Sequence, residues 1–233
     1  MRRIYLPRLA RPGLGRGRVL AVRVDKVRAV ASFARSERLA LCDTAISLGP
    51  SAPTLCEGWD VKDLLIHLLV RERRPWAAAG ILLPPLAPVL RKAEAAYAAQ
   101  DLETLAATLR DPRRTPFVLD PVDKLVNTVE FFVHHEDLRR AQSGWEPRHL
   151  PAAAERDIWR TLRLLGKGLV RASDVPLVIS DGTTTATLRT GEEPVTITGP
   201  VGEPCFRTLK VATPGRILWA GVRRRPRSIL RVL

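Results

Sequence analysis

The chain has 233 residues, of which 45% are hydrophobic, and a formal net charge of +14. This length can hold one large domain or two small ones with a substantial core, and no run approaches the roughly 18 consecutive apolar residues of a membrane-spanning helix. The three cysteines are odd in number and irregularly spaced, which argues against a disulfide framework or a cysteine zinc cluster. We therefore expect a globular, cytoplasmic protein that does not bind membranes.

The positive charge is concentrated at the two ends of the chain. Residues 1–28 contain nine Lys or Arg and one acidic residue, and residues 216–233 contain six Arg and no acidic residue. The segment between them is neutral, so the folded part is not expected to bind nucleic acid. We expect residues 1–26 to form a disordered basic leader and residues 216–233 an Arg-rich tail. Weak nucleic-acid binding through these ends remains an alternative, and it would fall steeply with salt.

Helical patterns fill the chain from about residue 25 to residue 172. The first helix is expected from Asp25 to Ser47, because apolar positions recur at helical spacing until Gly49 and Pro50 end the pattern. Asp60 is a good N-cap for the second helix, with Asp63 in the capping-box position. Further helices are expected at about residues 86–109, 120–142 and 152–172.

The helix at residues 120–142 is expected to be buried on most sides, because apolar residues occupy nearly every face of it. Glu130 and His134 lie in this apolar run, and their spacing of four residues places them on one face. His135 points about 100° away and cannot share a metal ion with Glu130 without distortion. A buried, unpaired carboxylate costs several kcal/mol, so Glu130 needs a cation, a proton or hydrogen-bond donors.

His67 is the one polar residue between Leu64 and Val70 of the second helix. A single core histidine is more often hydrogen-bonded to a carbonyl group, or here to Asp63, than bound to a metal. The Glu130 and His134 pair could likewise be a simple ion pair within one helix. Together, however, the three residues favour a metal site in the core of a helix bundle.

Two imidazoles and a carboxylate suit zinc, with nickel and iron as alternatives, and three protein ligands leave one position open for water or substrate. Asp63 could orient His67 or simply cap its helix, and Asn127 and Asp137 could orient the other ligands. Arginines close to these helices could bind an acidic thiol or an acidic substrate; the candidates are Arg71, Arg74 and Arg139.

After residue 172 the composition changes to short β-type runs, at residues 175–180, 183–189 and 194–198. We therefore expect a mainly α protein with a helical domain at residues 27–172. A small β-containing subdomain is expected to follow at residues 173–215.

Three stretches resemble the DinB-like metalloproteins, namely residues 53–68, 71–75 and 127–141. They are most similar to the branch that contains mycothiol-dependent maleylpyruvate isomerase, and the resemblance covers about residues 27–203. It implies an up-and-down four-helix bundle followed by a small α/β domain. It also implies a divalent metal ion held by three residues, and these match His67, Glu130 and His134. Finally, it implies mycothiol as a co-substrate.

Both ends depart from the family pattern. The residues ahead of Val27 have no counterpart in it, which suggests an upstream start codon or a disordered leader. From about Pro204 the chain is expected to have diverged or to be read out of frame, which would leave the second domain incomplete.

These features predict a metal-dependent, thiol-dependent transferase or isomerase that acts on a small molecule, as a monomer or homodimer. A non-catalytic metal-binding or interaction protein on the same bundle is the alternative.

Overall fold

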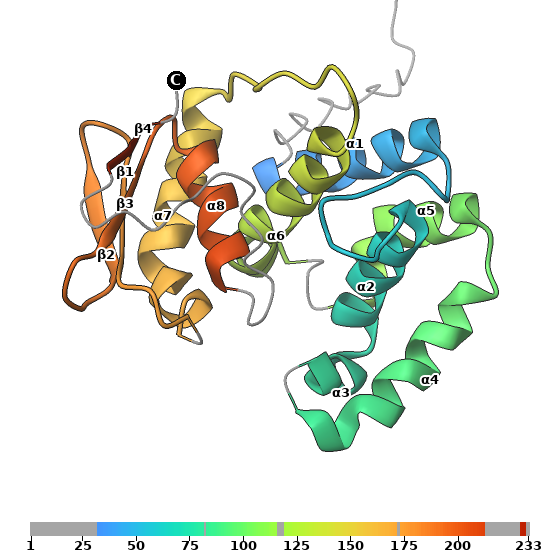
Figure 1. Cartoon of the computed structure of the whole chain (residues 1–233). Coiled ribbons are helices and arrows are strands. Elements are labelled where there is room, and N and C mark those ends of the chain that lie inside the picture. Colours follow the sequence, from blue (N-terminus) through green and yellow to red (C-terminus); the bar gives the residue numbers. More distant parts are fainter. Residues whose placement is uncertain (1–31, 82, 116–118, 172, 213–228, 232–233) are drawn as a thin grey trace, which may run out of the picture. The chain divides into compact units, whose positions relative to one another are not determined.

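The computed structural model describes residues 32–81, 83–115, 119–171, 173–212 and 229–231 (Figure 1). Helices dominate this part of the chain and a small sheet accompanies them, so the expected mainly α class is confirmed. Within the same residues no helix is long and apolar enough to cross a membrane. The basic leader and residues 213–228 of the C-terminal region lie outside the described residues.

The first two helices begin at the side-chain caps that their sequences supply. Helix α1 (Phe33–Leu48) follows Ser32, whose hydroxyl accepts a hydrogen bond from the Arg35 N–H at 3.2 Å. Helix α2 (Val61–Arg73) follows the predicted capping box. The Asp60 carboxylate accepts from the Asp63 N–H at 2.9 Å, and the Asp63 carboxylate accepts from the Asp60 N–H at 3.3 Å. The structure thus gives Asp63 the capping role.

Replacing Asp60 by Ala is expected to lower the free energy of unfolding by about 1 kcal/mol, because the first turn of α2 loses its side-chain acceptor. Asn is nearly as good an N-cap as Asp, so Asp60→Asn should remain close to the parent. Urea unfolding of the three proteins checks this, and equal losses in both variants would contradict the capping role.

The segment after α2 is divided into more short helices and turns than its sequence predicts. It contains α3 (Pro75–Ala78), the 3-10 turns η1 (Ala79–Ile81) and η2 (Pro84–Leu86), α4 (Ala87–Ala98), α5 (Leu102–Arg110) and the turn η3 (Pro112–Arg114). The prediction of one helix at residues 86–109 is therefore wrong. The Asp101 carboxylate accepts a hydrogen bond from the Thr104 N–H at 2.7 Å, so it caps a new helix instead of continuing the old one.

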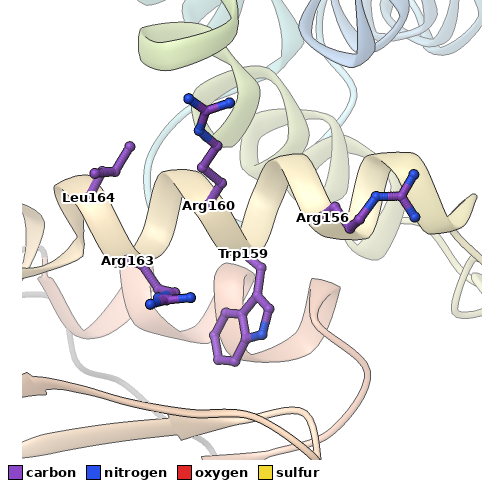
Figure 2. Close-up of a pocket in the computed structure, with 5 residues that line it drawn as sticks. All are labelled: Arg156, Trp159, Arg160, Arg163 and Leu164. Carbon is purple, nitrogen blue, oxygen red and sulfur yellow. The ribbon is translucent and has the colours of Figure 1, made fainter.

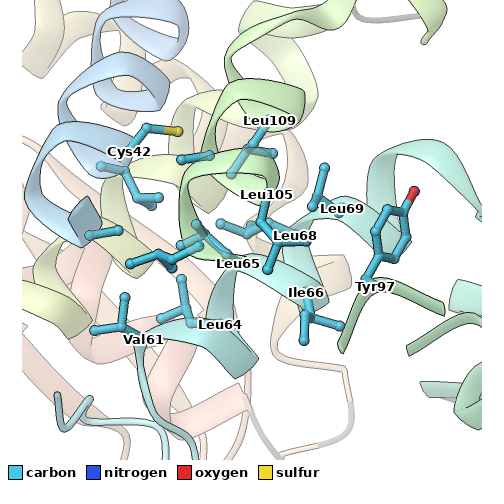
Figure 3. Packing of buried hydrophobic residues seen from close by; sticks show 14 of the residues in the cluster. Cys42, Val61, Leu64, Leu65, Ile66, Leu68, Leu69, Tyr97, Leu105 and Leu109 are labelled. Carbon is cyan, nitrogen blue, oxygen red and sulfur yellow. The ribbon is translucent and has the colours of Figure 1, made fainter. Parts of the chain in front are cut away.

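Helices α1, α2, α4 and α5 share the first hydrophobic core (Figure 3). Leucines on one face of α2 pack against Leu105 and Leu109 of α5, and Cys42 of α1 and Tyr97 of α4 lie at the edges of the cluster. The leucines of α2 in this core are Leu64, Leu65, Leu68 and Leu69. Because these residues fill the interior side of α2, His67 projects from another face of the helix.

Helix α6 (Asp120–Arg140) contacts α1, α7 and α8, and its middle is buried as predicted. Phe131 and Leu138 face the first core, whereas Val129, Phe132 and Val133 belong to a second core. Buried polar residues lie between these apolar groups. Helix α6 therefore contributes apolar side chains to both cores. Its buried polar side chains require hydrogen-bond or ion-pair partners.

One set of these polar side chains surrounds Arg38 of α1. Its guanidinium donates to both carboxylate oxygens of Glu72 at 2.6 and 2.7 Å and to Asp123 at 3.0 Å. The Asn127 amide donates to Glu72 at 2.9 Å and to Asp123 at 2.8 Å. Arg38 also lies over the Phe131 ring, 4.3 Å from its centroid. These contacts join α1, α2 and α6 through a buried, charged group.

A second set fixes His135 away from the candidate metal ligands. Its Nδ1 lies 3.0 Å from Glu37 and its Nε2 lies 3.0 Å from the Thr44 hydroxyl, both on α1. Arg148 donates to the same Glu37 carboxylate at 2.7 and 2.8 Å. Burial raises the pKa of Glu37, but the hydrogen bonds from His135 and Arg148 outweigh it, and the pKa is lowered.

The C-terminal part has α7 (Ala152–Leu169) and a mixed sheet. Its strands are β1 (Leu177–Ser180), β2 (Thr185–Arg189), β3 (Val195–Thr198) and β4 (Ile229–Arg231), in the order β2-β1-β3-β4. Strand β2 runs antiparallel to β1, whereas β3 is parallel to β1 and β4 is parallel to β3. Helix α8 (Gly202–Ala212) connects to β3 and packs on α6 and α7.

The sequence predicts neither α8 nor β4. The region from Pro204, expected to be divergent, is helical, and it buries Cys205 and Phe206 in the second core. Three residues of the expected Arg-rich tail extend the sheet as β4. The mixture of polar and apolar residues at 202–212 does not predict a helix by itself, because the apolar face becomes recognisable only when the surface that it covers is known.

Candidate metal centre

The structure brings His67, Glu130 and His134 together, and we call these three residues the central trio. His67 lies on α2, and the other two lie on α6. The two imidazole rings have their centroids 5.4 Å apart, in an edge-to-face arrangement. His134 Nε2 lies 3.7 Å from Glu130 Oε2. The side chains of Glu130 and His134 remain 23% and 14% exposed, so the group is reachable from solvent.

Asp137 fixes the orientation of the His134 ring. Its fully buried carboxylate lies 3.1 Å from His134 Nδ1, one turn along α6. With Nδ1 engaged by Asp137, Nε2 is the nitrogen that faces Glu130. A carboxylate on the outer nitrogen of a histidine is the usual support of a metal ligand in proteins.

The charges of the central trio are set by burial and by neighbouring groups. Burial lowers the pKa of His67 to about 4, and the positive charge of His134 contributes, so this imidazole is neutral at pH 7. Burial also lowers the pKa of His134, but hydrogen bonds with Asp137 and Cys56 raise it to about 10. Burial raises the pKa of Glu130, but the positive charges of Arg71 and His134 outweigh this effect, and the pKa is lowered overall.

Arg71 is the arginine of α2 that reaches the central trio. Its Nε lies 3.5 Å from Glu130 Oε2, and its guanidinium donates to Asn127 Oδ1 at 2.7 Å and to the Val126 carbonyl at 3.2 Å. Asn127 in turn contacts the buried Glu72 carboxylate. Glu130 therefore already has a positive partner, and a metal ion would share this carboxylate with Arg71.

Arg74 and Arg139, the other two candidate arginines, are placed differently. Arg139 donates to Glu136 at 2.7 Å and to the Glu146 carbonyl at 2.9 Å. Arg74 is exposed at the junction of α2 and α3. The contacts of the described residues place neither arginine beside Glu130.

Cys56 also lies at the site, although no feature of the sequence predicted it. Its Sγ lies 3.2 Å from Asp137 Oδ2, the oxygen that also contacts His134. One ligand atom from each of Cys56, His134 and Asp137 lies within 4.8 Å of the others, so these residues form a possible metal-binding group, the thiol trio. Among the described residues the central trio is not gathered as tightly. Cys56 reaches α6 through a loop whose path no local pattern specifies.

A cavity of about 340 Å³ opens beside His67. The Trp59 ring forms one wall and lies 4.9 Å from the His67 ring. The remaining lining residues are Gly58, Asp63, Ile66, Glu94, Ala95 and Ala98. A small molecule in this cavity would contact His67 directly.

A larger cavity of about 490 Å³ lies along α7 (Figure 2). Its lining consists of Arg156, Trp159, Arg160, Arg163 and Leu164. No member of the central trio or the thiol trio lines it. Of these two cavities, the smaller one therefore reaches the central trio, and it does so through His67.

No family model, curated protein or solved structure matches this chain. The candidate site therefore rests on its own geometry and chemistry.

The donor set of the central trio suits a divalent transition metal ion. A neutral His67 and the Nε2 of His134 are imidazole ligands, which suit zinc, nickel and iron, and an ionised Glu130 adds a carboxylate oxygen that these ions also accept. Asp137 supplies the supporting carboxylate. An incoming ion would displace the proton that His134 carries at neutral pH.

Proposed function

We propose that this chain holds a divalent transition metal ion with His67, Glu130 and His134 and is a thiol-dependent transferase or isomerase of small molecules. The observation that carries the proposal is the setting of His134. Its Nδ1 is held by a fully buried carboxylate, while its Nε2 faces Glu130 and its ring faces His67. A carboxylate also holds Nδ1 of His135, but the other nitrogen of His135 contacts Thr44, whereas that of His134 faces a second carboxylate. A supporting carboxylate on one nitrogen and a second acidic group facing the other are what a histidine metal ligand requires here.

Each residue has a distinct task in this proposal. The central trio binds the ion, Asp137 orients His134, and the cavity at Trp59 receives the substrate. When bound, zinc or a similar ion lowers the pKa of a coordinated thiol or water and so provides a nucleophile. Arg71 neutralises Glu130 and, through its contacts with Asn127 and Val126, holds that side of the site in place.

The resemblance to DinB-like metalloproteins forms part of the proposal. In that family the metal ligands match the same three residues. The resemblance also implies a helical bundle as the scaffold and mycothiol as the thiol. Arg74 is exposed at the end of α2, so it is available to bind an acidic thiol. Arg139 is engaged by Glu136, so binding through it would require that ion pair to open.

A thiol-conjugation assay tests the function. Metal-free protein and protein loaded with zinc, nickel or iron would be mixed with mycothiol or another small thiol and a panel of electrophiles. We expect thiol consumption with at least one metal and none in Glu130→Gln, with His149→Ala as a control because this histidine is exposed and outside the site. Equal rates in metal-free and metal-loaded protein would contradict the proposal.

The Arg71–Glu130 ion pair favours a second candidate, a non-catalytic interaction protein in which these polar residues only stabilise the bundle. This candidate predicts that Glu130→Gln changes stability but that no metal ion changes any property of the protein. Metal-dependent thermal stabilisation of the parent, absent in Glu130→Gln, would exclude it.

A further inference from the structure

We infer that the thiol trio is a second metal site, one that takes a thiophilic divalent ion of the zinc or cadmium class on the opposite side of the His134 ring. This site would use Cys56 Sγ, Asp137 Oδ2 and His134 Nδ1, whereas the proposed catalytic ion uses His134 Nε2. The inference therefore stands on different ligand atoms from the proposed function, although both involve His134.

The distances already approach those of a coordinated ion. Asp137 Oδ2 lies 3.2 Å from Cys56 Sγ and 3.1 Å from His134 Nδ1. Around a tetrahedral zinc ion, with bonds of about 2.0–2.3 Å, neighbouring ligand atoms are about 3.3–3.6 Å apart. The Asp137 oxygen would need to move away from each of the other two ligand atoms by only a few tenths of an ångström, and the third pair already lies within 4.8 Å.

The loop that carries Cys56 is held in place by its own hydrogen bonds. The Thr54 hydroxyl accepts from the Cys56 N–H at 3.0 Å and donates to the Trp59 carbonyl at 2.9 Å. The Trp59 N–H donates to the Cys56 carbonyl at 3.0 Å. The Leu55 N–H donates to the Asp137 carbonyl at 3.2 Å, so the loop is attached at the residue that supplies the carboxylate ligand. This pre-ordering lowers the entropic cost of gathering the ligands.

The ligand types select the class of ion. A thiolate, an imidazole and one carboxylate favour zinc, cadmium or cobalt over magnesium and calcium, which prefer oxygen ligands. Three protein ligands leave a fourth position for water. On binding, the Cys56 thiol releases its proton and the His134 imidazolium releases its Nδ1 proton to the solvent, and the lone pairs of Sγ and Nδ1 form the new bonds. When the proposed catalytic ion also occupies Nε2, the ring has released both protons and bridges the two ions as an imidazolate.

Cobalt substitution in the full chain tests the inference directly. Thiolate ligation gives Co²⁺ a sulfur-to-metal charge-transfer band in the near ultraviolet, which ligands without sulfur cannot produce. We expect this band in the parent, its loss in Cys56→Ser and its retention in Cys42→Ala. Ser keeps a hydrogen-bond donor for Asp137, and Cys42 is a buried cysteine in the first core, outside the site.

The other outcomes separate this inference from the proposed function. Co²⁺ binding without the charge-transfer band, lost in Glu130→Gln, would overturn the thiol site and leave the central trio standing. A band that persists in Cys56→Ser would also overturn it. A band retained in Glu130→Gln but lost in Cys56→Ser would support it, whatever the central trio does. If the parent bound no Co²⁺, both the inference and the proposed function would fail.

Discussion

Replacing Arg38 by Met is expected to lower the free energy of unfolding by about 3–5 kcal/mol, because the change leaves buried carboxylates without their cation. Arg38 and Glu72 have side chains that are each 1% exposed, and Asp123 is 5% exposed. The Asn127 amide would still donate to both carboxylates, but a neutral donor does not offset two buried negative charges.

The matched control is Arg110→Met. Arg110 also pairs with an aspartate, Asp43, but their side chains are 32% and 72% exposed. Removing a solvent-exposed ion pair is expected to cost no more than about 1 kcal/mol. Urea unfolding followed by circular dichroism gives both values. Similar small losses in the two variants would show that the buried cluster contributes little to stability.

Replacing Asp137 by Asn is expected to weaken metal binding by the central trio about 10–100-fold, because loss of a carboxylate behind a histidine ligand commonly has this effect. Asn has nearly the shape of Asp but no charge to hold His134 Nδ1–H. The measurement is a competition titration with a chromophoric chelator. It is best made in a Cys56→Ser background, so that no thiolate contributes.

Asp63→Asn serves as the control for this titration. Asp63 lines the same cavity as His67, but its carboxylate caps α2 and has no contact with His134 among the described interactions. Its replacement should leave the affinity within about twofold of the parent, since it is not behind a ligand. If Asp137→Asn bound the ion as tightly as Asp63→Asn, Asp137 would not be a positioning residue.

Local features of the sequence predicted the parts of the fold that depend on neighbours along the chain. The Asp60–Asp63 capping box, the buried middle of α6 and the placement of Glu130 and His134 on one face all follow from helical geometry. The helix break at Asp101 also depends on a neighbouring residue, the Asp101 cap of α5. It was missed because the Ala-rich residues around it continue a helical pattern, and a single capping residue does not interrupt that pattern.

The site's remaining features depend on contacts between distant segments. Cys56 meets Asp137 across 81 residues of chain, and Arg71 meets Asn127 across 56. No spacing rule predicts such pairs, because they depend on how a loop crosses a helix and how two helices pack. Helix α8 was missed for a related reason. Its short apolar face packs on α6 and α7, and the sequence near it does not show that these helices are its partners.

The metal content of the protein tests the central claim most directly. The full chain, in the Cys56→Ser background and purified without a metal-binding tag, would be analysed for transition metals beside variants that also carry His67→Ala, Glu130→Gln or His149→Ala. We predict about one equivalent of zinc, nickel or iron in the Cys56→Ser protein, as expected for a single three-ligand site. This metal should be lost with His67→Ala and Glu130→Gln and retained with His149→Ala. Absence of metal from all four folded proteins, even after incubation with each ion, would contradict the account.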